Sequence, residues 1–356
     1  MLREYWYIAG QSGELAAGKP IARRLLGTDL VLWRDRNGGV NALQEYCAHR
    51  GAPLSRGRVQ GDNIQCPFHG WTFDRSGRCV AIPSLPDDCP IPRRATVRAY
   101  PAREAGGYVW VYLGEKTDTL PPLPLPPEFD EPGWAIARRY HDVETDYTRL
   151  VEQNVDLVHF GFVHRGTFGR NMGPKDWEQW EVTSSPQGFR IKYGNDVPTW
   201  ILNKRWNSRI GASDALMAGI HFEMPNVFRV VQSGMVLGLF SVPIERGRTR
   251  LYQYTARCWF TGVPVLSWLL SQLTLQLNRI ILAEDMPILL RQKPNRIPDD
   301  PRAEVLIASD RAELLYRGLR ANYFKAHPSE SPIRPPHAAG ADRDLASTRP
   351  RAQAAS

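Results

Sequence analysis

With 356 residues, 42% of them hydrophobic and 10% aromatic, the chain is long enough for two domains with hydrophobic cores, which excludes a largely disordered protein. Its five cysteines are odd in number and too few for a disulfide-stabilised scaffold. The formal net charge of +8 is dispersed, without a dense run of Lys and Arg, so we expect a solvated basic surface and no nucleic-acid partner.

No segment of the sequence shows the pattern of a membrane element. Residues 1–6 lack the charged, apolar and small-residue regions of a signal peptide. The most apolar stretch, residues 263–290, is interrupted by the polar side chains of Ser267, Ser271, Gln272, Gln276, Asn278 and Arg279. Because this stretch is too polar for a spanning helix, we expect a cytoplasmic protein with no membrane contact.

Residues 1–118 are predicted to form an all-β domain, since short β-branched and aromatic runs alternate with turn residues there. Residues 31–33, Val-Leu-Trp, precede the turn sequence Arg-Asn-Gly-Gly at 36–39, a combination typical of a β-hairpin. Residues 107–114 are rich in Val, Tyr and Trp between two glycines, and they predict another strand.

A proline-rich segment separates this region from the rest of the chain. Residues 120–127 contain five prolines, which cannot donate backbone hydrogen bonds, so residues 119–133 are expected to form an extended linker. Residues 134–327 have a mixed pattern that predicts an α+β domain. Residues 328–356 are rich in Pro, Ser, Ala and Arg and are expected to be a disordered tail.

Within the second domain we expect a helix at 148–159, strands at 188–193 and 251–260, and then a long helix. Apolar residues recur along that helix with a period of 3.6, which predicts one buried face formed by Leu266, Leu269, Leu270, Leu273, Leu277, Ile280 and Ile281.

The first cluster of metal-binding residue types lies in the β-rich region. Cys47-Ala48-His49 is followed, after sixteen residues, by Cys66-Pro67-Phe68-His69. Two cysteines and two histidines are common ligands of a structural zinc ion. Here, however, each loop supplies one sulfur and one nitrogen, a division that suits a two-iron, two-sulfur cluster with cysteines on one iron and histidines on the other.

The second cluster lies in the predicted α+β domain. On a helix Glu152, Asp156 and His159 would share one face, and a bend at Gly161 would bring His164 towards His159. An amphipathic helix with two incidental histidines is the alternative. Two histidines and one carboxylate bind Fe(II) in non-haem oxygenases.

The third ligand must come from elsewhere in the chain. Glu284 and Asp285 lie within an apolar stretch of the long helix, where a buried carboxylate needs a partner. Helical phase places Glu284 nearer the centre of the apolar stripe than Asp285. Pro287 disturbs the backbone nearby, so phase alone does not decide between them.

The two clusters resemble a known family. Cys47-x-His49 and Cys66-x-x-His69-Gly70-Trp71 are similar to the signature of Rieske ferredoxins and Rieske oxygenases, with Cys47 and Cys66 on one iron and His49 and His69 on the other. Asp156-x-x-His159-x4-His164 with a distant Glu-Asp pair resembles the catalytic domain of Rieske oxygenases. The resemblance covers residues 5–325 and is nearest to the vanillate O-demethylase and dicamba monooxygenase group. It implies a [2Fe–2S] cluster and a mononuclear Fe(II).

By this resemblance His159, His164 and Asp285 bind the mononuclear iron. Asp156 bridges His159 to His69 of a neighbouring subunit, which implies a head-to-tail homotrimer. Many relatives place an asparagine directly after the acid at position 152. This chain has Gln153 and then Asn154, which puts any role of an asparagine near the iron in doubt.

The resemblance implies an oxygenase that hydroxylates or oxidatively demethylates a small aromatic or cyclic substrate with O2. No Gly-rich dinucleotide fingerprint is present, so we expect a separate NAD(P)H-dependent reductase or ferredoxin to supply electrons. A ring-hydroxylating dioxygenase, a non-enzymatic Rieske electron carrier and a zinc-stabilised binding module are the alternatives. His221 and an apolar pocket are further candidates for substrate contact, although ordinary core positions account for these residues more simply. The pocket would be formed by Trp177, Trp180, Trp200, Trp206, Phe222 and Phe228.

Overall fold

The computed structural model describes residues 1–115, 119–192, 218–232 and 234–331. Strands alone build the N-terminal part apart from short 3-10 turns, namely β1 Trp6–Gln11, β2 Ile21–Leu25, β3 Thr28–Arg34, β4 Val40–Gln44, β5 Arg58–Gln60, β6 Asn63–Gln65, β7 Thr72–Phe73, β8 Cys79–Ala81, β9 Ala99–Tyr100, β10 Ala102–Ala105 and β11 Tyr108–Tyr112. They form three antiparallel sheets with the orders β1-β11-β10, β2-β3-β4-β9 and β5-β6-β7-β8. The predicted all-β domain is confirmed, and the predicted hairpin is the β3–β4 pair, with Gly38 at φ +82° in its turn.

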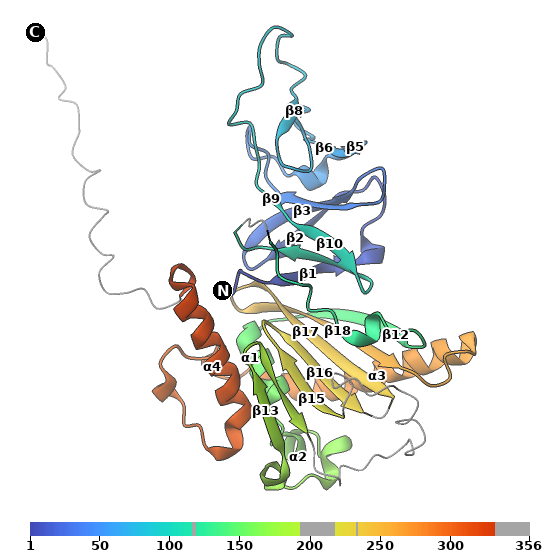
Figure 1. The fold of residues 1–356 in the computed structure, drawn as a ribbon, viewed down its shortest axis with the longest axis vertical. Helices are drawn as coiled ribbons and strands as arrows, with labels where there is room; N and C mark the ends of the chain where they lie inside the picture. The colour runs from blue at the N-terminus through green and yellow to red at the C-terminus, as the bar shows by residue number, and fades with distance from the viewer. Residues whose placement is uncertain (116–118, 193–217, 233, 332–356) are drawn as a thin grey trace, which may run out of the picture.

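The C-terminal part is a seven-stranded antiparallel sheet with helices around it (Figure 1). Its strands are β12 Ala135–Val143, β13 Glu181–Ser185, β14 Gly188–Lys192, β15 Gly219–Glu223, β16 Val227–Gln232, β17 Met235–Glu245 and β18 Arg248–Arg257. Its helices are α1 Tyr147–Val155, α2 Phe160–Val163, α3 Pro264–Leu289 and α4 Arg311–Ala326. The sheet order is β12-β18-β17-β16-β15-β14-β13. The predicted α+β class is therefore confirmed.

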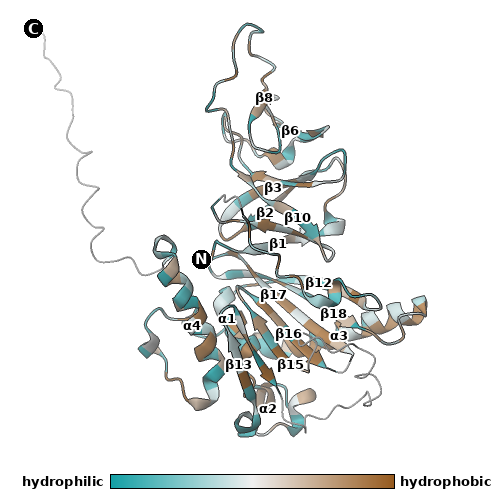
Figure 2. Ribbon diagram, in the orientation of Figure 1, coloured by the Kyte–Doolittle hydropathy of each residue, from teal (hydrophilic) through white to brown (hydrophobic). Residues whose placement is uncertain are grey.

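One of three hydrophobic clusters contains residues of both parts, and Figure 2 shows hydrophobic residues along the strands of the large sheet. The ring centroid of Tyr108 on β11 lies 5.8 Å from those of both Phe240 on β17 and Tyr252 on β18. The predicted linker also contributes. Glu128 is fully buried and accepts hydrogen bonds from Arg229 at 3.1 Å and from Tyr254 at 2.5 Å. Because an unpaired buried charge is costly, this triad fastens the segment between the domains to the large sheet.

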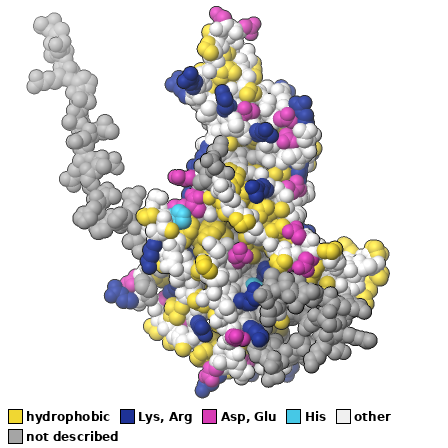
Figure 3. Space-filling model, viewed as in Figure 1, with side chains coloured by type: hydrophobic (Ala, Val, Ile, Leu, Met, Phe, Trp, Pro, Cys, Tyr) yellow, Lys and Arg dark blue, Asp and Glu magenta, His cyan; other side chains and the backbone are white. Residues whose placement is uncertain are grey.

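The apolar stripe of helix α3 is exposed, so the prediction of a buried apolar face is wrong. Leu269, Leu273, Leu277 and Ile280 are 51–57% exposed. The opposite side of α3 faces the protein and carries polar groups. Arg257 donates a hydrogen bond to the Ser267 hydroxyl at 2.6 Å, and Arg139 donates one to a backbone carbonyl of α3. A periodic pattern identifies residues that share a face but not the direction of that face. Figure 3 shows the apolar side chains of the projecting end of α3 at the surface.

By its length and composition, helix α3 could span a membrane, although its sequence was expected to be too polar for this. Among the described residues, α3 is the one helix long and apolar enough to cross a membrane, and only 17% of its most apolar stretch is buried. This finding concerns length and composition alone.

Glu313 on α4 gives the folded chain a pH-dependent stability. Burial raises the pKa of this carboxyl from 4.5 to about 8, and the nearby Asp156, Asp310 and Glu152 add to the shift. Between these pH values the folded state holds a proton that the unfolded chain releases, so stability falls as pH rises. At about 1.36 kcal/mol per pK unit the upper limit is roughly 4–5 kcal/mol.

We therefore expect the stability of Glu313→Gln relative to the wild type to be greater at pH 8.5 than at pH 5.5, because glutamine does not titrate. Urea denaturation at both pH values measures the difference. An equal difference in stability at the two pH values would contradict the assignment.

Candidate metal centres

Two loops of the N-terminal domain present the four predicted cluster ligands. In the first, the Cys47 N–H donates to Ala52 O at 2.9 Å and the Gly51 N–H donates to Cys47 O at 2.9 Å. The second loop repeats this pattern, because the Cys66 N–H donates to Trp71 O at 2.8 Å and the Gly70 N–H donates to Cys66 O at 3.2 Å. Both glycines have positive φ, +68° and +73°, which only glycine adopts without strain.

The donor atoms of these loops fall into a sulfur pair and an imidazole pair. Cys47 and Cys66 are each 3% exposed. Burial raises the pKa of Cys47 to about 11, and its hydrogen bond with Cys66 adds to the shift. The rings of His49 and His69 lie 4.6 Å apart. A donor set divided in this way fits two metal ions better than one.

The histidines lie nearer the surface than the cysteines, among aromatic residues. Trp71 stacks on His49 with a centroid distance of 4.5 Å, and Phe68, which is 61% exposed, contacts His69 at 3.9 Å. His49 Nδ1 is buried and has no hydrogen-bond partner among the described residues. Its pKa is lowered by loss of hydration and by the charges of His69 and Arg50, which favours the neutral ring that binds metals. A [2Fe–2S] cluster therefore fits these four residues.

In the C-terminal domain the structure brings His159, His164 and Asp285 together, and one ligand atom from each lies within 4.8 Å of the others. His164 Nε2 is 3.2 Å and His159 Nε2 is 3.6 Å from Asp285 Oδ1. The side chains are 1%, 13% and 14% exposed for His164, His159 and Asp285. Asp285 Oδ1 makes no hydrogen bond with the residues that the structure describes, so two imidazoles converge on an unsatisfied buried oxygen. This set fits a mononuclear metal ion of the 2-His-1-carboxylate type.

The local fold around these ligands differs from the predicted continuous helix. Helix α1 ends at Val155, because Asp156 Oδ1 accepts the Val158 N–H at 2.8 Å and turns the chain. His159 and His164 then flank the short helix α2 at its two ends. Gly161 lies within α2 and is not the bend. A Cβ at Gly161 would lie 2.6 Å from Met172 O, so glycine permits close backbone packing.

Asp156 lies beside His159, as the sequence resemblance implies. Its Oδ2 is 3.3 Å from His159 Nδ1, which is ion-pair distance without hydrogen-bond alignment. The Asp156 side chain is 33% exposed and remains accessible to another molecule.

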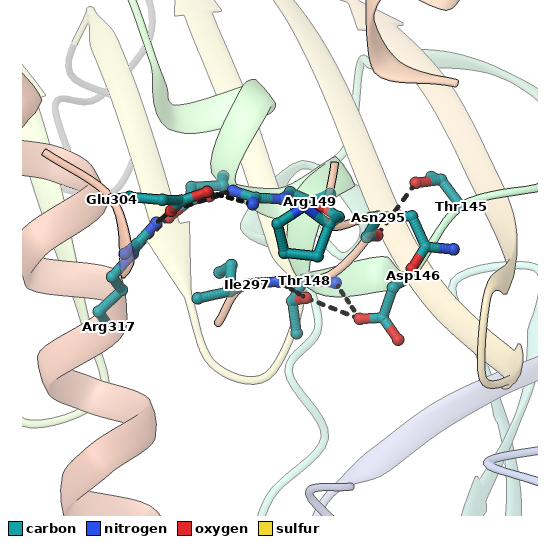
Figure 4. A network of polar contacts seen from close by, with 10 residues as sticks. Thr145, Asp146, Thr148, Arg149, Asn295, Ile297, Glu304 and Arg317 are labelled. Carbon is teal, nitrogen blue, oxygen red and sulfur yellow. Dashed lines mark hydrogen bonds and ion pairs between the residues drawn. The ribbon is translucent and has the colours of Figure 1, made fainter. Parts of the chain in front are cut away.

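The segment after α3 ties helix α1 in place (Figure 4). Asp146 caps α1 by accepting the Thr148 N–H at 3.0 Å and the Thr148 hydroxyl at 2.6 Å. The Thr148 hydroxyl in turn accepts the Ile297 N–H at 3.1 Å, and the Thr145 hydroxyl donates to Asn295 O at 3.4 Å. These bonds link the start of α1 to residues that follow Asp285 in the chain, so the two sources of metal ligands are held together.

A four-membered ion network completes this attachment and corrects the predicted place of Glu152. Arg149 contacts Glu152 at 2.8 Å and also pairs with Glu304. Arg317 on α4 contacts Glu152 at 2.6 Å and Glu304 at 2.5 Å (Figure 4). Glu152 therefore faces α4 and does not share a face with His159, because the helix ends before that residue. Two positive and two negative groups balance in this partly buried ring.

Further side chains surround His164. The Phe168 ring stacks on the His164 ring with a centroid distance of 4.7 Å, and Glu284 Oε2 lies 2.8 Å from His164 Nδ1. Burial lowers the pKa of His164, but the interactions with Asp285 and Glu284 outweigh burial and the pKa is raised. The sequence predicted no role for Phe168, and its helical phase left Glu284 open beside Asp285 as the third metal ligand; the structure places Glu284 behind His164. The position of Glu284 nearer the centre of the apolar stripe than Asp285 was the available signal.

Where the structure describes them, the predicted pocket residues do not gather around the metal-site residues. Trp177 and Trp180 line a cavity of about 110 Å³ next to Leu157 and Glu313, whose lining includes none of the three proposed ligands. Phe222 and Phe228 are 3% and 4% exposed in the core, and Trp200 and Trp206 lie outside the described residues. His221 on β15 lies opposite Arg190 on β14 and Arg229 on β16 in the register of the sheet. Gln153 Oε1 and Asn154 Nδ2 are buried without hydrogen bonds in the described structure.

Comparison with known proteins accounts for both halves of the chain. Residues 5–101 match the Rieske [2Fe-2S] domain, and residues 143–326 match the vanillate O-demethylase oxygenase C-terminal domain. A chlorophyllide a oxygenase of Chlamydomonas reinhardtii is 29% identical over 94% of this chain and 51% of its own length. A 5,5'-dehydrodivanillate O-demethylase oxygenase subunit of Sphingobium is 29% identical over 73% of this chain and 62% of its own length. The chain spans about half the length of the curated relatives it matches.

Solved structures agree with this match. NdmA of Pseudomonas putida CBB5 is 26% identical, with a TM-score of 0.73 over 92% of each chain. A match of residues 143–326 to an oxygenase domain argues against the alternative of a stand-alone electron carrier, and the Rieske match argues against the zinc module. The family's N-terminal domain binds a [2Fe–2S] cluster and its C-terminal domain uses a mononuclear iron. The chain therefore belongs to the Rieske non-haem iron oxygenases, with a C-terminal domain of the vanillate O-demethylase type.

Proposed function

We propose that this protein is the oxygenase component of a system that hydroxylates or oxidatively demethylates a small aromatic or cyclic organic compound with O2. The observation that carries the proposal is the convergence of His159 Nε2, His164 Nε2 and Asp285 Oδ1 in one partly buried site. Electrons would come from a separate NAD(P)H-dependent reductase, directly or through a ferredoxin. The basic net charge of +8 suits an acidic electron-transfer partner.

The chain's own residues divide the work between two sites. Cys47, Cys66, His49 and His69 would hold the cluster, and His159, His164 and Asp285 would hold the iron. When bound, the cluster stores one electron and the mononuclear iron activates O2 beside the substrate. Burial of His164, which is 1% exposed under the Phe168 ring, excludes water from one side of the site.

The apolar side of α3 supports an apolar substrate. Ile280 and Leu277 precede Glu284 by four and seven residues, so they lie on the same face of α3 as Glu284, which contacts His164. They are 54% and 52% exposed, and Leu273 and Leu269 continue the stripe. Relatives carry names such as chlorophyllide a oxygenase and dehydrodivanillate O-demethylase, and one NdmA structure contains caffeine. A cyclic, largely apolar substrate bound along this face is consistent with all of these.

The arrangement of the two sites favours an oligomer. The β5–β8 sheet beside the cluster loops lies at one end of the molecule and α2 lies at the other (Figure 1). Asp156 is 33% exposed next to His159, and Phe68 is 61% exposed next to His69. A head-to-tail homotrimer would bring His69 of one subunit to Asp156 of the next. We propose that this assembly works in the cytoplasm.

A product assay tests the proposed reaction. The purified protein, with a Rieske reductase, NADH and O2, is incubated with methoxy- and N-methyl-substituted aromatic compounds. We expect formaldehyde from at least one compound, with NADH consumption in equal amount, and none from Asp285→Ala. A diol without formaldehyde would show ring dihydroxylation instead. No substrate-dependent O2 uptake across both classes, despite intact metal centres, would contradict the proposed substrate class.

A further inference from the structure

We propose that Glu284 is a positioning residue of the metal centre, holding the His164 ring so that Nε2 faces the bound ion; this rests on the metal site proposed above. Glu284 Oε2 lies 2.8 Å from His164 Nδ1. On the other side of the ring, Asp285 Oδ1 lies 3.2 Å from His164 Nε2. Two consecutive residues of α3 therefore meet the two nitrogens of one imidazole.

This geometry selects one tautomer of His164. Glu284 Oε2 is an acceptor, because it also receives the Thr167 hydroxyl, so Nδ1 carries the proton of the hydrogen bond between Glu284 and His164. The lone pair of the neutral ring then lies on Nε2, the atom that faces Asp285 Oδ1, which His159 Nε2 also approaches. A carboxylate behind a metal-binding histidine fixes the ring orientation and raises the basicity of the ligand nitrogen.

Glu284 is itself held in place. The Thr167 hydroxyl donates to the same carboxylate oxygen at 2.8 Å. The Thr167 N–H donates to His164 O at 3.0 Å, so a tight turn fixes the distance between the hydroxyl and the imidazole. His164, Thr167 and Glu284 thus form a closed set of contacts from two elements, the turn after α2 and helix α3.

The contact is better formed than the corresponding contact at the other histidine. Asp156 Oδ2 lies 3.3 Å from His159 Nδ1 without hydrogen-bond alignment. Glu284 is also less exposed, with 24% of its side chain accessible against 33% for Asp156. Glu284 is therefore the carboxylate whose removal should disturb the metal affinity of the site more.

Metal titration tests the role of Glu284. Full-length protein with an intact cluster is freed of mononuclear metal with a chelator and titrated with Co(II) by calorimetry. We expect Glu284→Ala to bind Co(II) about 10–100-fold more weakly than the wild type. Glu284→Gln, which keeps an acceptor oxygen, should fall between the two. Glu181→Gln, a change at a carboxylate that is 70% exposed, is the control and should match the wild type.

A proton NMR spectrum of the Co(II)-loaded protein adds a readout that general destabilisation does not move. The shifted, exchangeable Nδ1–H resonance of His164 should disappear by exchange with water in Glu284→Ala and persist in Glu284→Gln. The positioning role alone would be overturned if Glu284→Ala bound Co(II) within twofold of the wild type and kept the resonance while Asp285→Ala did not bind Co(II). Unchanged Co(II) binding in Asp285→Ala would overturn the metal site and the inference with it.

Discussion

Asp285→Ala is expected to lose the mononuclear iron and the oxygenase activity while keeping the visible spectrum of the [2Fe–2S] cluster. The carboxylate oxygen of Asp285 lies 3.2 Å and 3.6 Å from the two imidazole nitrogens, so it is the atom on which the site converges. Loss of a carboxylate that only supports a ligand costs about 10–100-fold in affinity or activity, and loss of a ligand should cost more. Iron analysis and O2 uptake measure both effects.

The ranking of the two adjacent acids is part of this prediction. Glu284→Ala should weaken the site but retain measurable activity, because it removes a support and leaves all three ligands in place. Glu181→Gln should have no effect in the same assays. An Asp285→Ala protein that retains full iron, or a Glu284→Ala protein that loses more iron than Asp285→Ala, would contradict the assignment of ligands.

Asp156→Asn is expected to keep both metal centres and to lower oxygenase turnover by about 100-fold, the upper end of the range for such residues. Asp156 approaches His159 Nδ1 at 3.3 Å and its side chain is 33% exposed, so it can reach a second subunit. Asparagine removes the charge and one acceptor oxygen from this contact. Stopped-flow absorbance of the prereduced protein, mixed with substrate and O2, measures how fast the cluster is reoxidised. Asp88→Asn, at an exposed site, is the control.

Mixing inactive variants under conditions of subunit exchange tests the route between subunits. His69→Ala and Asp285→Ala chains should restore activity together, because one supplies the cluster and its neighbour the iron. Asp156→Asn and Asp285→Ala chains should not, because Asp156 and the iron ligands belong to the same subunit. Activity in the second mixture, or none in the first after proven exchange, would contradict the proposed homotrimer.

The loops that carry Cys47, His49, Cys66 and His69 could be predicted from the sequence because their determinants are local. Each loop closes within five residues, and Gly51 and Gly70 stand where the backbone requires positive φ. The spacing of the residues therefore contains most of the geometry. The all-β character of the surrounding domain follows from equally short-range signals.

The environment of the second site depends on contacts that sequence spacing does not contain. Asp156 ends α1 by accepting backbone N–H groups, which a helical projection does not anticipate. His164 and Glu284 meet across 120 residues of sequence. Helical phase put Glu284 nearer the centre of the apolar stripe than Asp285, but only the fold shows that it faces His164. The direction of that stripe was wrong for the same reason, since packing decides which face of α3 is covered.

Metal and sulfide analysis of the anaerobically purified protein tests most directly whether one chain holds two separate iron centres. The ligand sets predict about three irons and about two acid-labile sulfides per chain. His69→Ala should retain about one iron, bound at His159, His164 and Asp285, and lose the sulfide. Stoichiometric zinc, or loss of all iron together in His69→Ala, would contradict two independent sites.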